Sequence, residues 1–90
     1  MGVDLVMHSV TKYLNGHSDV TAGAIMGARD RIAAIEPARK LLGTMLDPAA
    51  GFAVSRGLKT LELRMQRHNS NGLAVADALQ GMPGVHAVHY

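Results

Sequence analysis

The sequence predicts an α/β fold, and three of its features support this prediction. Two short apolar segments near the N-terminus, Val3–Met7 and Val20–Met26, contain β-branched residues, as buried strands do. The stretch from Asp30 to Gln80 instead carries helix-start residues, helix-stop residues and apolar residues at helical spacing. The last segment, Val85–Tyr90, alternates apolar and polar residues, which is typical of a strand. We therefore expect strands towards both ends and helices between them.

A polar segment from His8 to Asp19 separates the first two predicted strands. Within it, Asn15-Gly16 is a strong turn signal. Gly23 lies inside the second predicted strand, where a glycine favours the close approach of another backbone or of a ligand. The first third of the chain is thus predicted to be a strand, a long polar loop and a second strand.

The first predicted helix starts at Asp30, whose side chain can cap it. Pro37 predicts a kink or a restart, because proline lacks the N–H that a helix interior needs. Gly43 is a favourable residue just beyond the helix end.

Two more helices are predicted after it. Asp47-Pro48 combines an N-cap residue with proline at the first helical position, which predicts a helix to about Arg56 with Gly57 as its stop. Thr60 then caps a longer helix that ends near Gln80.

The composition excludes several classes of protein. The 90 residues contain no cysteine, which removes zinc–cysteine sites, iron–sulfur clusters, thiol catalysis and disulfides, and fits a cytoplasmic location. A net charge of +2 with only 3% aromatic residues is poor support for a nucleic-acid partner. No apolar run approaches the roughly 20 residues of a membrane helix, so no membrane association is expected. With so few aromatics, we expect a thin core of aliphatic side chains and methionine.

The histidines and the basic residues each suggest a site, and each has a simpler interpretation. His86 and His89 would point to opposite faces of a strand, so no metal site is predicted. His17 is better interpreted as a residue that braces its loop. The basic residues after position 55 are expected to form a solvated helix face, with Glu62 as a local partner and no binding role. They are Arg56, Lys59, Arg64 and Arg67.

Lys12 lies in the densest cluster of reactive side chains, between the hydroxyls of Ser9 and Thr11 and the phenol of Tyr13. A lysine near apolar walls and other cations loses basicity and becomes a nucleophilic amine. Hydroxyls and loop amides can hold a phosphate, and a lysine beside a phosphate cup is what pyridoxal phosphate needs. Taken alone, the same pattern also fits a solvated turn with an exposed lysine.

The region around Lys12 resembles the pyridoxal-lysine region of the Cys/Met-metabolism (trans-sulfuration) enzymes, which are pyridoxal-phosphate-dependent. The matching residues there are Ser9–Tyr13, Gly16–Asp19 and Gly23. Further motifs of the family follow in the same order, so the resemblance covers essentially the whole chain. They are Arg39–Gly43, Leu46–Pro48, Arg56–Leu61, Leu63–Met65, Arg67–Asn69, Asn71 and the closing Val85–Tyr90.

The resemblance implies a fragment of a fold-type-I (aspartate aminotransferase-like) enzyme. Lys12 would form a Schiff base with pyridoxal 5′-phosphate and later move a proton on the substrate, while Ser9 and Thr11 would hydrogen-bond the cofactor phosphate. Residues 1–59 would be the C-terminal part of the cofactor-binding large domain, 60–82 an inter-domain helix, and 83–90 the first strand of the C-terminal domain. The polar residues around Lys12 would shape its loop. These are His8, Tyr13, Asn15 and Gly16–Asp19.

The family implies a lyase or transferase of sulfur amino acid metabolism, working by β- or γ-elimination or replacement. Its substrates would be amino acids of the cystathionine, methionine, cysteine or O-acyl-homoserine class, and the full-length enzyme would be a homo-oligomer. The carboxylate that pairs with the pyridine nitrogen in this family, and the arginine that binds the substrate carboxylate, have no counterpart among these residues. We therefore expect this 90-residue chain alone to be inactive or poorly active, and the alternative is a non-catalytic folding or interaction module.

Overall fold

The computed structural model describes residues 2–90, and Met1, the first residue of the predicted large-domain segment, lies outside them. The chain forms two compact units, which divide between Lys59 and Thr60 and are described separately. The assignment of these units to domains of a longer enzyme remains a prediction.

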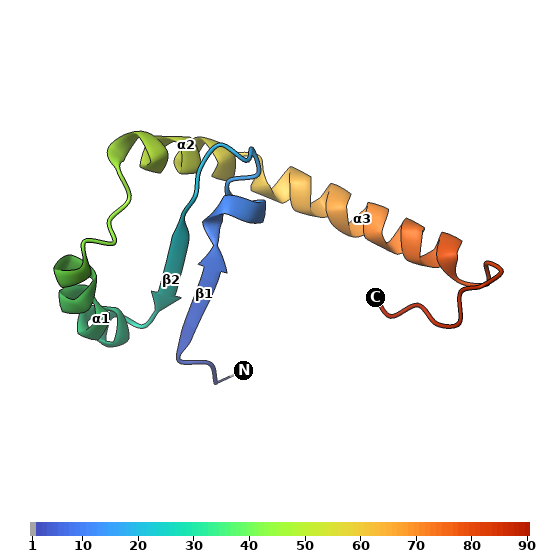
Figure 1. Ribbon diagram of the computed structural model, residues 1–90, viewed down its shortest axis with the longest axis horizontal. Helices are drawn as coiled ribbons and strands as arrows, with labels where there is room; N and C mark the ends of the chain where they lie inside the picture. The colour runs from blue at the N-terminus through green and yellow to red at the C-terminus, as the bar shows by residue number, and fades with distance from the viewer. Residues whose placement is uncertain (1) are drawn as a thin grey trace. The chain divides into compact units, whose positions relative to one another are not determined.

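The first unit contains a two-stranded antiparallel sheet of β1, Leu5–Ser9, and β2, Gly23–Gly27 (Figure 1). Its register runs from Leu5 opposite Gly27 to Ser9 opposite Gly23. The two predicted strands are present, but both lie further along the chain than their hydrophobic runs. Just before the second strand, the carbonyl of Ala22 accepts from the amides of Val10 and Thr11 at 2.9 and 3.3 Å.

Helix α1, Arg29–Leu42, follows the sheet. The predicted cap at Asp30 is wrong, because Ala28 precedes the first helical residue and Asp30 lies in the first turn, where its charge still favours the helix dipole. The predicted restart at Pro37 does not occur either, since this residue lies inside one helix. The stop at Gly43 is confirmed by its left-handed backbone, with φ of 69°.

Helix α2, Pro48–Leu58, begins as predicted. The carboxylate of Asp47 caps it, with Oδ1 accepting from the amide of Ala50 at 3.0 Å. The helix continues beyond its predicted end, because Gly57 is a buried helical residue rather than a stop.

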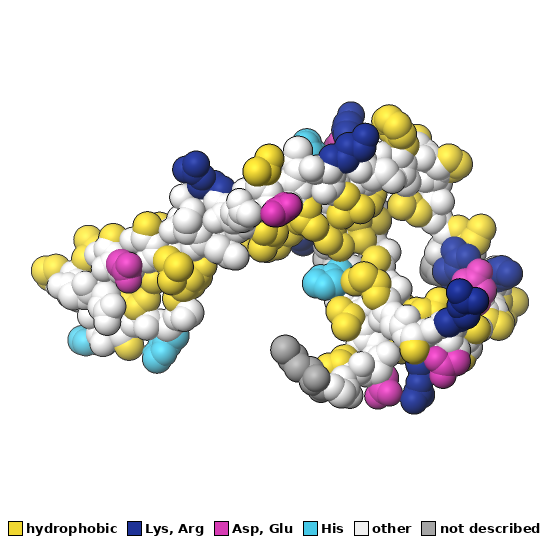
Figure 2. All heavy atoms as spheres, turned by 180° about the vertical axis from the view of Figure 1, so that it is seen from behind, with side chains coloured by type: hydrophobic (Ala, Val, Ile, Leu, Met, Phe, Trp, Pro, Cys, Tyr) yellow, Lys and Arg dark blue, Asp and Glu magenta, His cyan; other side chains and the backbone are white. Residues whose placement is uncertain are grey.

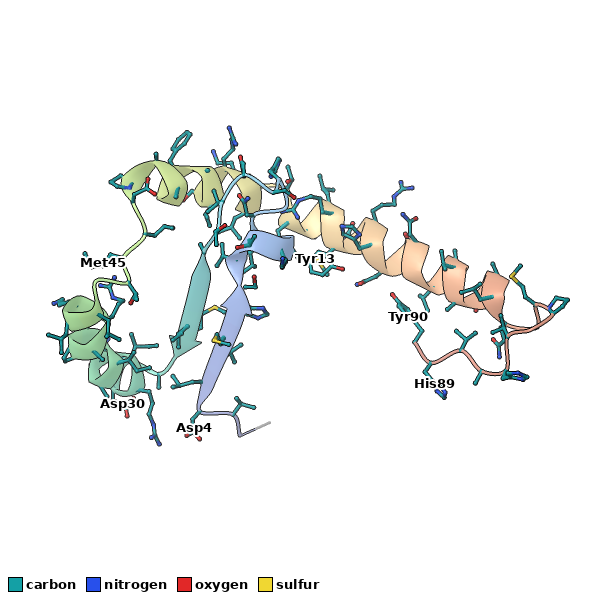
Figure 3. All side chains as sticks on the ribbon, viewed as in Figure 1. Asp4, Tyr13, Asp30, Met45, His89 and Tyr90 are labelled. Atoms are coloured by element: carbon teal, nitrogen blue, oxygen red, sulfur yellow. The ribbon has the colours of Figure 1, made fainter. Side chains whose placement is uncertain are left out.

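The second unit contains helix α3, Leu61–Leu79, close to the predicted bounds. Thr60 precedes it, but its hydroxyl accepts from Nε of Arg64 at 3.1 Å instead of capping a backbone amide. The predicted strand Val85–Tyr90 is not formed, because among the described residues no strand pairs with it. Instead the ring of Tyr90 lies against α3, as Figure 3 shows, and its hydroxyl is 3.5 Å from the carbonyl oxygen of Asn69.

The core is thin, as expected. Within residues 2–90 the buried hydrophobic side chains are Val10 and Val20, and the one fully buried side chain is the polar Asn15. Apolar side chains cover much of the face drawn in Figure 2, and Leu41 and Phe52 are 89% and 71% exposed. None of the helices described here has the length and hydropathy needed to cross a membrane. The best-packed residues therefore lie in the loop between the two strands.

Candidate functional site

A short kinked turn, η1, Val10–Leu14, follows β1 directly and carries Lys12. It closes through the amide of Asn15, which donates to the carbonyl of Val10 at 2.9 Å, and the amide of Gly16, which donates to the carbonyl of Lys12 at 2.7 Å. Lys12 itself leaves helical geometry, with φ −84° and ψ −119°, and its side chain is exposed. The sheet thus delivers the lysine at the end of β1, at the point where the turn departs from helical geometry.

Thr11 ties this turn to the residue just before β2. Its Oγ1 accepts from the amide of Ala22 at 2.9 Å, and it lies 3.4 Å from the Ala22 carbonyl oxygen, to which its own proton points. The second contact is long and therefore weak. The Thr11 hydroxyl can consequently keep the bond from Ala22 and still give its proton to an anion.

Ser9 is the last residue of β1, and its side chain is exposed. It pairs with Gly23, where an added Cβ would meet nothing nearer than the carbonyl oxygen of His8 at 3.8 Å. The three predicted site residues therefore lie within one short stretch at the strand end, and each offers a donor. A primary amine beside two hydroxyl donors fits the aldehyde and the phosphate of pyridoxal phosphate.

Asn15 closes the turn and is fully buried. Its Nδ2 donates to Oδ1 of Asp19 at 2.7 Å, and its carbonyl accepts from Nδ1 of His17 at 2.7 Å. The prediction that His17 braces the loop is confirmed by this bond, which places the ring proton on Nδ1 because a carbonyl only accepts.

Helix α2 supports the turn from outside. Arg56 forms an ion pair with Asp19, with Nη2 to Oδ2 at 3.0 Å. A Cβ added at Gly57 would come within 3.0 Å of the carbonyl carbon and Cα of Asn15, so the helix packs directly on the backbone of the turn. The hydrogen bond from Asn15, followed by smaller effects that include the Arg56 charge, lowers the pKa of Asp19 below its usual value.

The sequence did not reveal these contacts from α2. We predicted that Arg56 lies on a solvated helix face with Glu62 as local partner. In the structure Arg56 instead forms an ion pair with Asp19, and the carboxylate of Glu62 accepts from Nε2 of Gln66 at 3.3 Å. No local pattern links Arg56 to a residue 37 positions earlier, so only the three-dimensional structure joins them. Within residues 2–90, no three histidine or carboxylate side chains gather as a metal ion would require.

Known proteins resemble this chain over its whole length. The family model for Cys/Met metabolism PLP-dependent enzymes matches residues 1–90, where PLP denotes pyridoxal phosphate. The chain is 43% identical over 90 residues to a probable cystathionine gamma-synthase 2 of Arabidopsis thaliana, covering 100% of this chain and 22% of that protein. It is 42% identical over 92 residues to the L-methionine gamma-lyase of Porphyromonas gingivalis, covering 100% of this chain and 23% of the relative.

A solved structure shares the fold. The crystal structure of cystathionine gamma-lyase from Lactobacillus plantarum, complexed with L-serine, matches 96% of this chain and 23% of its own, with a TM-score of 0.88 and 37% identity. The chain thus spans less than a quarter of the length of these relatives. The family match over every residue, together with these similarities, establishes that the chain belongs to the Cys/Met metabolism family of PLP-dependent enzymes.

Proposed function

We propose that this chain is the lysine-bearing segment of an enzyme of sulfur amino acid metabolism that uses Lys12 to hold pyridoxal 5′-phosphate. One observation carries the proposal. The exposed side chain of Lys12 leaves a kinked turn at the end of β1, within three residues of the hydroxyls of Ser9 and Thr11. This arrangement supports covalent capture of an aldehyde beside a bound phosphate.

The roles of the chain's own residues follow from their chemistry. Nζ of Lys12 would hold the cofactor through its aldehyde carbon, with release of one water, and the freed amine would later move a proton between the substrate's Cα and the carbons beyond it. The hydroxyls of Ser9 and Thr11 donate hydrogen bonds to the phosphate and so fix the position of the cofactor relative to Lys12. When bound, pyridoxal phosphate supplies an electron sink that stabilises negative charge at that carbon.

The reaction class is β- or γ-elimination or replacement. The names of the relatives, which point to cystathionine and methionine, support sulfur amino acids or activated homoserine as substrates. The relatives are about four times as long as this chain, so the turnover, the substrates and a homo-oligomeric assembly belong in this proposal to the complete enzyme. The absence of cysteine supports a cytoplasmic location.

Borohydride trapping tests the role of Lys12. We would incubate the 90-residue chain with pyridoxal 5′-phosphate, reduce it and locate the pyridoxyl group by peptide mass spectrometry. Modification should concentrate on Lys12 and disappear in Lys12→Ala. Lys40→Ala is the matched control, because Lys40 is an exposed lysine of the same unit that pairs with Glu36 on α1. Equal labelling of Lys12, Lys40 and Lys59 would refute the proposed site.

A second candidate function is a non-catalytic folding or interaction module. The exposure of large apolar side chains, such as Leu41 and Phe52, favours it, because such surface is normally covered by other protein. The two candidates differ in capture of the cofactor by this chain, because turnover belongs to the complete enzyme in either case. Selective borohydride trapping of pyridoxal 5′-phosphate at Lys12 would support the enzyme segment, whereas a chain that folds but traps none at Lys12 would support the module.

A further inference from the structure

The carboxylate of Asp19 joins two parts of the first unit that are distant in sequence. Its Oδ1 accepts from Nδ2 of Asn15 at 2.7 Å, and its Oδ2 accepts from Nη2 of Arg56 at 3.0 Å. Each oxygen therefore has its own partner, one in the lysine turn and one on α2. Arg56 lies 37 residues beyond Asp19 in the chain, so this carboxylate is a tertiary link and not a local turn contact.

The side chain of Asn15 has only one orientation compatible with this link. A carboxylate accepts and cannot donate, so the amide nitrogen of Asn15 has to face Asp19. Oδ1 of Asn15 is then buried with no hydrogen-bond partner among the described residues. An apolar residue would avoid that unpaired acceptor, so the bond to Asp19 is the feature that favours an amide at this position.

The backbone of Asn15 transmits this link to the lysine. Its amide closes the turn on the carbonyl of Val10, and the amide of the next residue, Gly16, donates to the carbonyl of Lys12 at 2.7 Å. Because these two bonds enclose Lys12, a shift of the Asn15 backbone would change the direction in which the lysine leaves the turn.

We propose that Asn15, Asp19 and Arg56 form a positioning unit through which α2 sets the orientation of the Lys12 turn. In this unit Asp19 bonds to both other residues, and Arg56 fixes its carboxylate to α2. Asn15 connects the carboxylate to the backbone of the turn. These residues act through Lys12 and do not touch a cofactor themselves. The link to catalysis rests on the proposed function of Lys12, whereas the link to the turn does not.

Amide hydrogen exchange of the free chain tests the structural part without any cofactor. In Arg56→Ala, exchange at Asn15 and Gly16 should rise about two- to fivefold relative to the original chain, because the half-exposed ion pair between Arg56 and Asp19 is lost. Exchange in the β1–β2 ladder should not change, which separates loosening of the turn from global unfolding. Arg56→Lys keeps the charge and should restore most of the protection.

The matched control is Arg31→Ala. Arg31 also forms an exposed ion pair in this unit, with Asp4 at 3.3 Å, but it lies outside the positioning unit. The Arg31→Ala substitution should therefore leave hydrogen exchange at Asn15 and Gly16 unchanged. If Arg56→Ala exchanges like Arg31→Ala at these two amides, the positioning unit does not exist.

The second arm measures capture of pyridoxal 5′-phosphate by Lys12, trapped with borohydride. Arg56→Ala and Asp19→Asn should slow capture at Lys12 severalfold, and labelling of Lys40 should stay constant. If the original chain captures none at Lys12, the proposed function fails while the exchange result still decides the positioning unit. If capture at Lys12 is equal in all variants although exchange has risen, the turn is braced but does not orient the lysine, and the inference is overturned.

Discussion

Gly57 of α2 lies directly on the backbone of Asn15, with no room for a side chain between them. A Cβ at Gly57 would come within 3.0 Å of the Asn15 Cα and carbonyl carbon. These are backbone atoms of a buried residue, which cannot rotate away as the end of a flexible side chain can. The helix and the lysine turn therefore touch through a glycine that the sequence suggested was only a stop signal.

Gly57→Ala should destabilise the first unit by about 1–3 kcal/mol, because the new methyl group has to push the turn away from α2. Gly51→Ala is the matched control in the same helix, since a Cβ there meets nothing within 4 Å. That substitution should stabilise the helix by about 0.5–1 kcal/mol through its better helix propensity. Urea denaturation of the two variants measures both values. A gain in stability for Gly57→Ala would contradict the close packing.

Asp47→Ala should cost about 1 kcal/mol, because the carboxylate caps the free amide of Ala50 at the start of α2. Asp30→Ala should cost only a few tenths of a kcal/mol, since Asp30 lies inside the first turn of α1 and contributes through the helix dipole alone. Thermal unfolding followed by circular dichroism compares the two aspartates. Equal costs would show that Asp30 also caps its helix, as the sequence suggested.

Gly72→Ala should release Tyr90 from α3. An added Cβ would lie 2.6 Å and 2.9 Å from two carbons of the Tyr90 ring, and this exposed ring can move away. The helix itself should gain about 0.8–1 kcal/mol, as expected for alanine in place of glycine. Nuclear Overhauser contacts between the Tyr90 ring and α3 should vanish in this variant and persist in Tyr90→Phe, which keeps the ring. Persistence in both variants would show that the ring does not rest on Gly72.

The stability of the lysine turn should fall in acid. The hydrogen bond from Asn15 lowers the pKa of Asp19 in the folded chain below its unfolded value. The stabilising contribution of Asp19 is therefore fully present above the unfolded pKa of about 4 and is lost as the pH falls through the lowered folded pKa. A carbon-13 titration of the Asp19 carboxyl should show this depression, and Asn15→Ala should move the pKa back upward. An unchanged pKa in Asn15→Ala would exclude Asn15 as the main cause.

Local chemistry made some of the fold predictable from the sequence. Asp47 caps α2 and Gly43 ends α1, because these choices depend on atoms only a few residues apart. Asp30 was misassigned as a cap, since an aspartate in the first turn and an aspartate at the N-cap look alike in a sequence. The predicted strand Val85–Tyr90 failed for another reason, which is that a strand needs a partner and the alternation of its residues cannot supply one.

The candidate site likewise has a part that the sequence predicts and a part that only the tertiary structure shows. Ser9, Thr11 and Lys12 are neighbours in the chain, so the sequence motif alone was enough to place them together, and their roles remain predictions. The support from Arg56 and Gly57 was not predictable, because the contact depends on how α2 folds back over the turn.

The dependence of the lysine turn on α2 limits how the motif can be transplanted. A peptide of residues 5–27 would contain Lys12 and both strands, but it would lack the helix surface that meets Asn15 and the charge that holds Asp19. Such a graft should present a lysine on a loosely ordered loop. A designer who wants to move this turn onto another scaffold has to bring the α2 face with it, since the smallest transferable part is the turn together with its supporting helix.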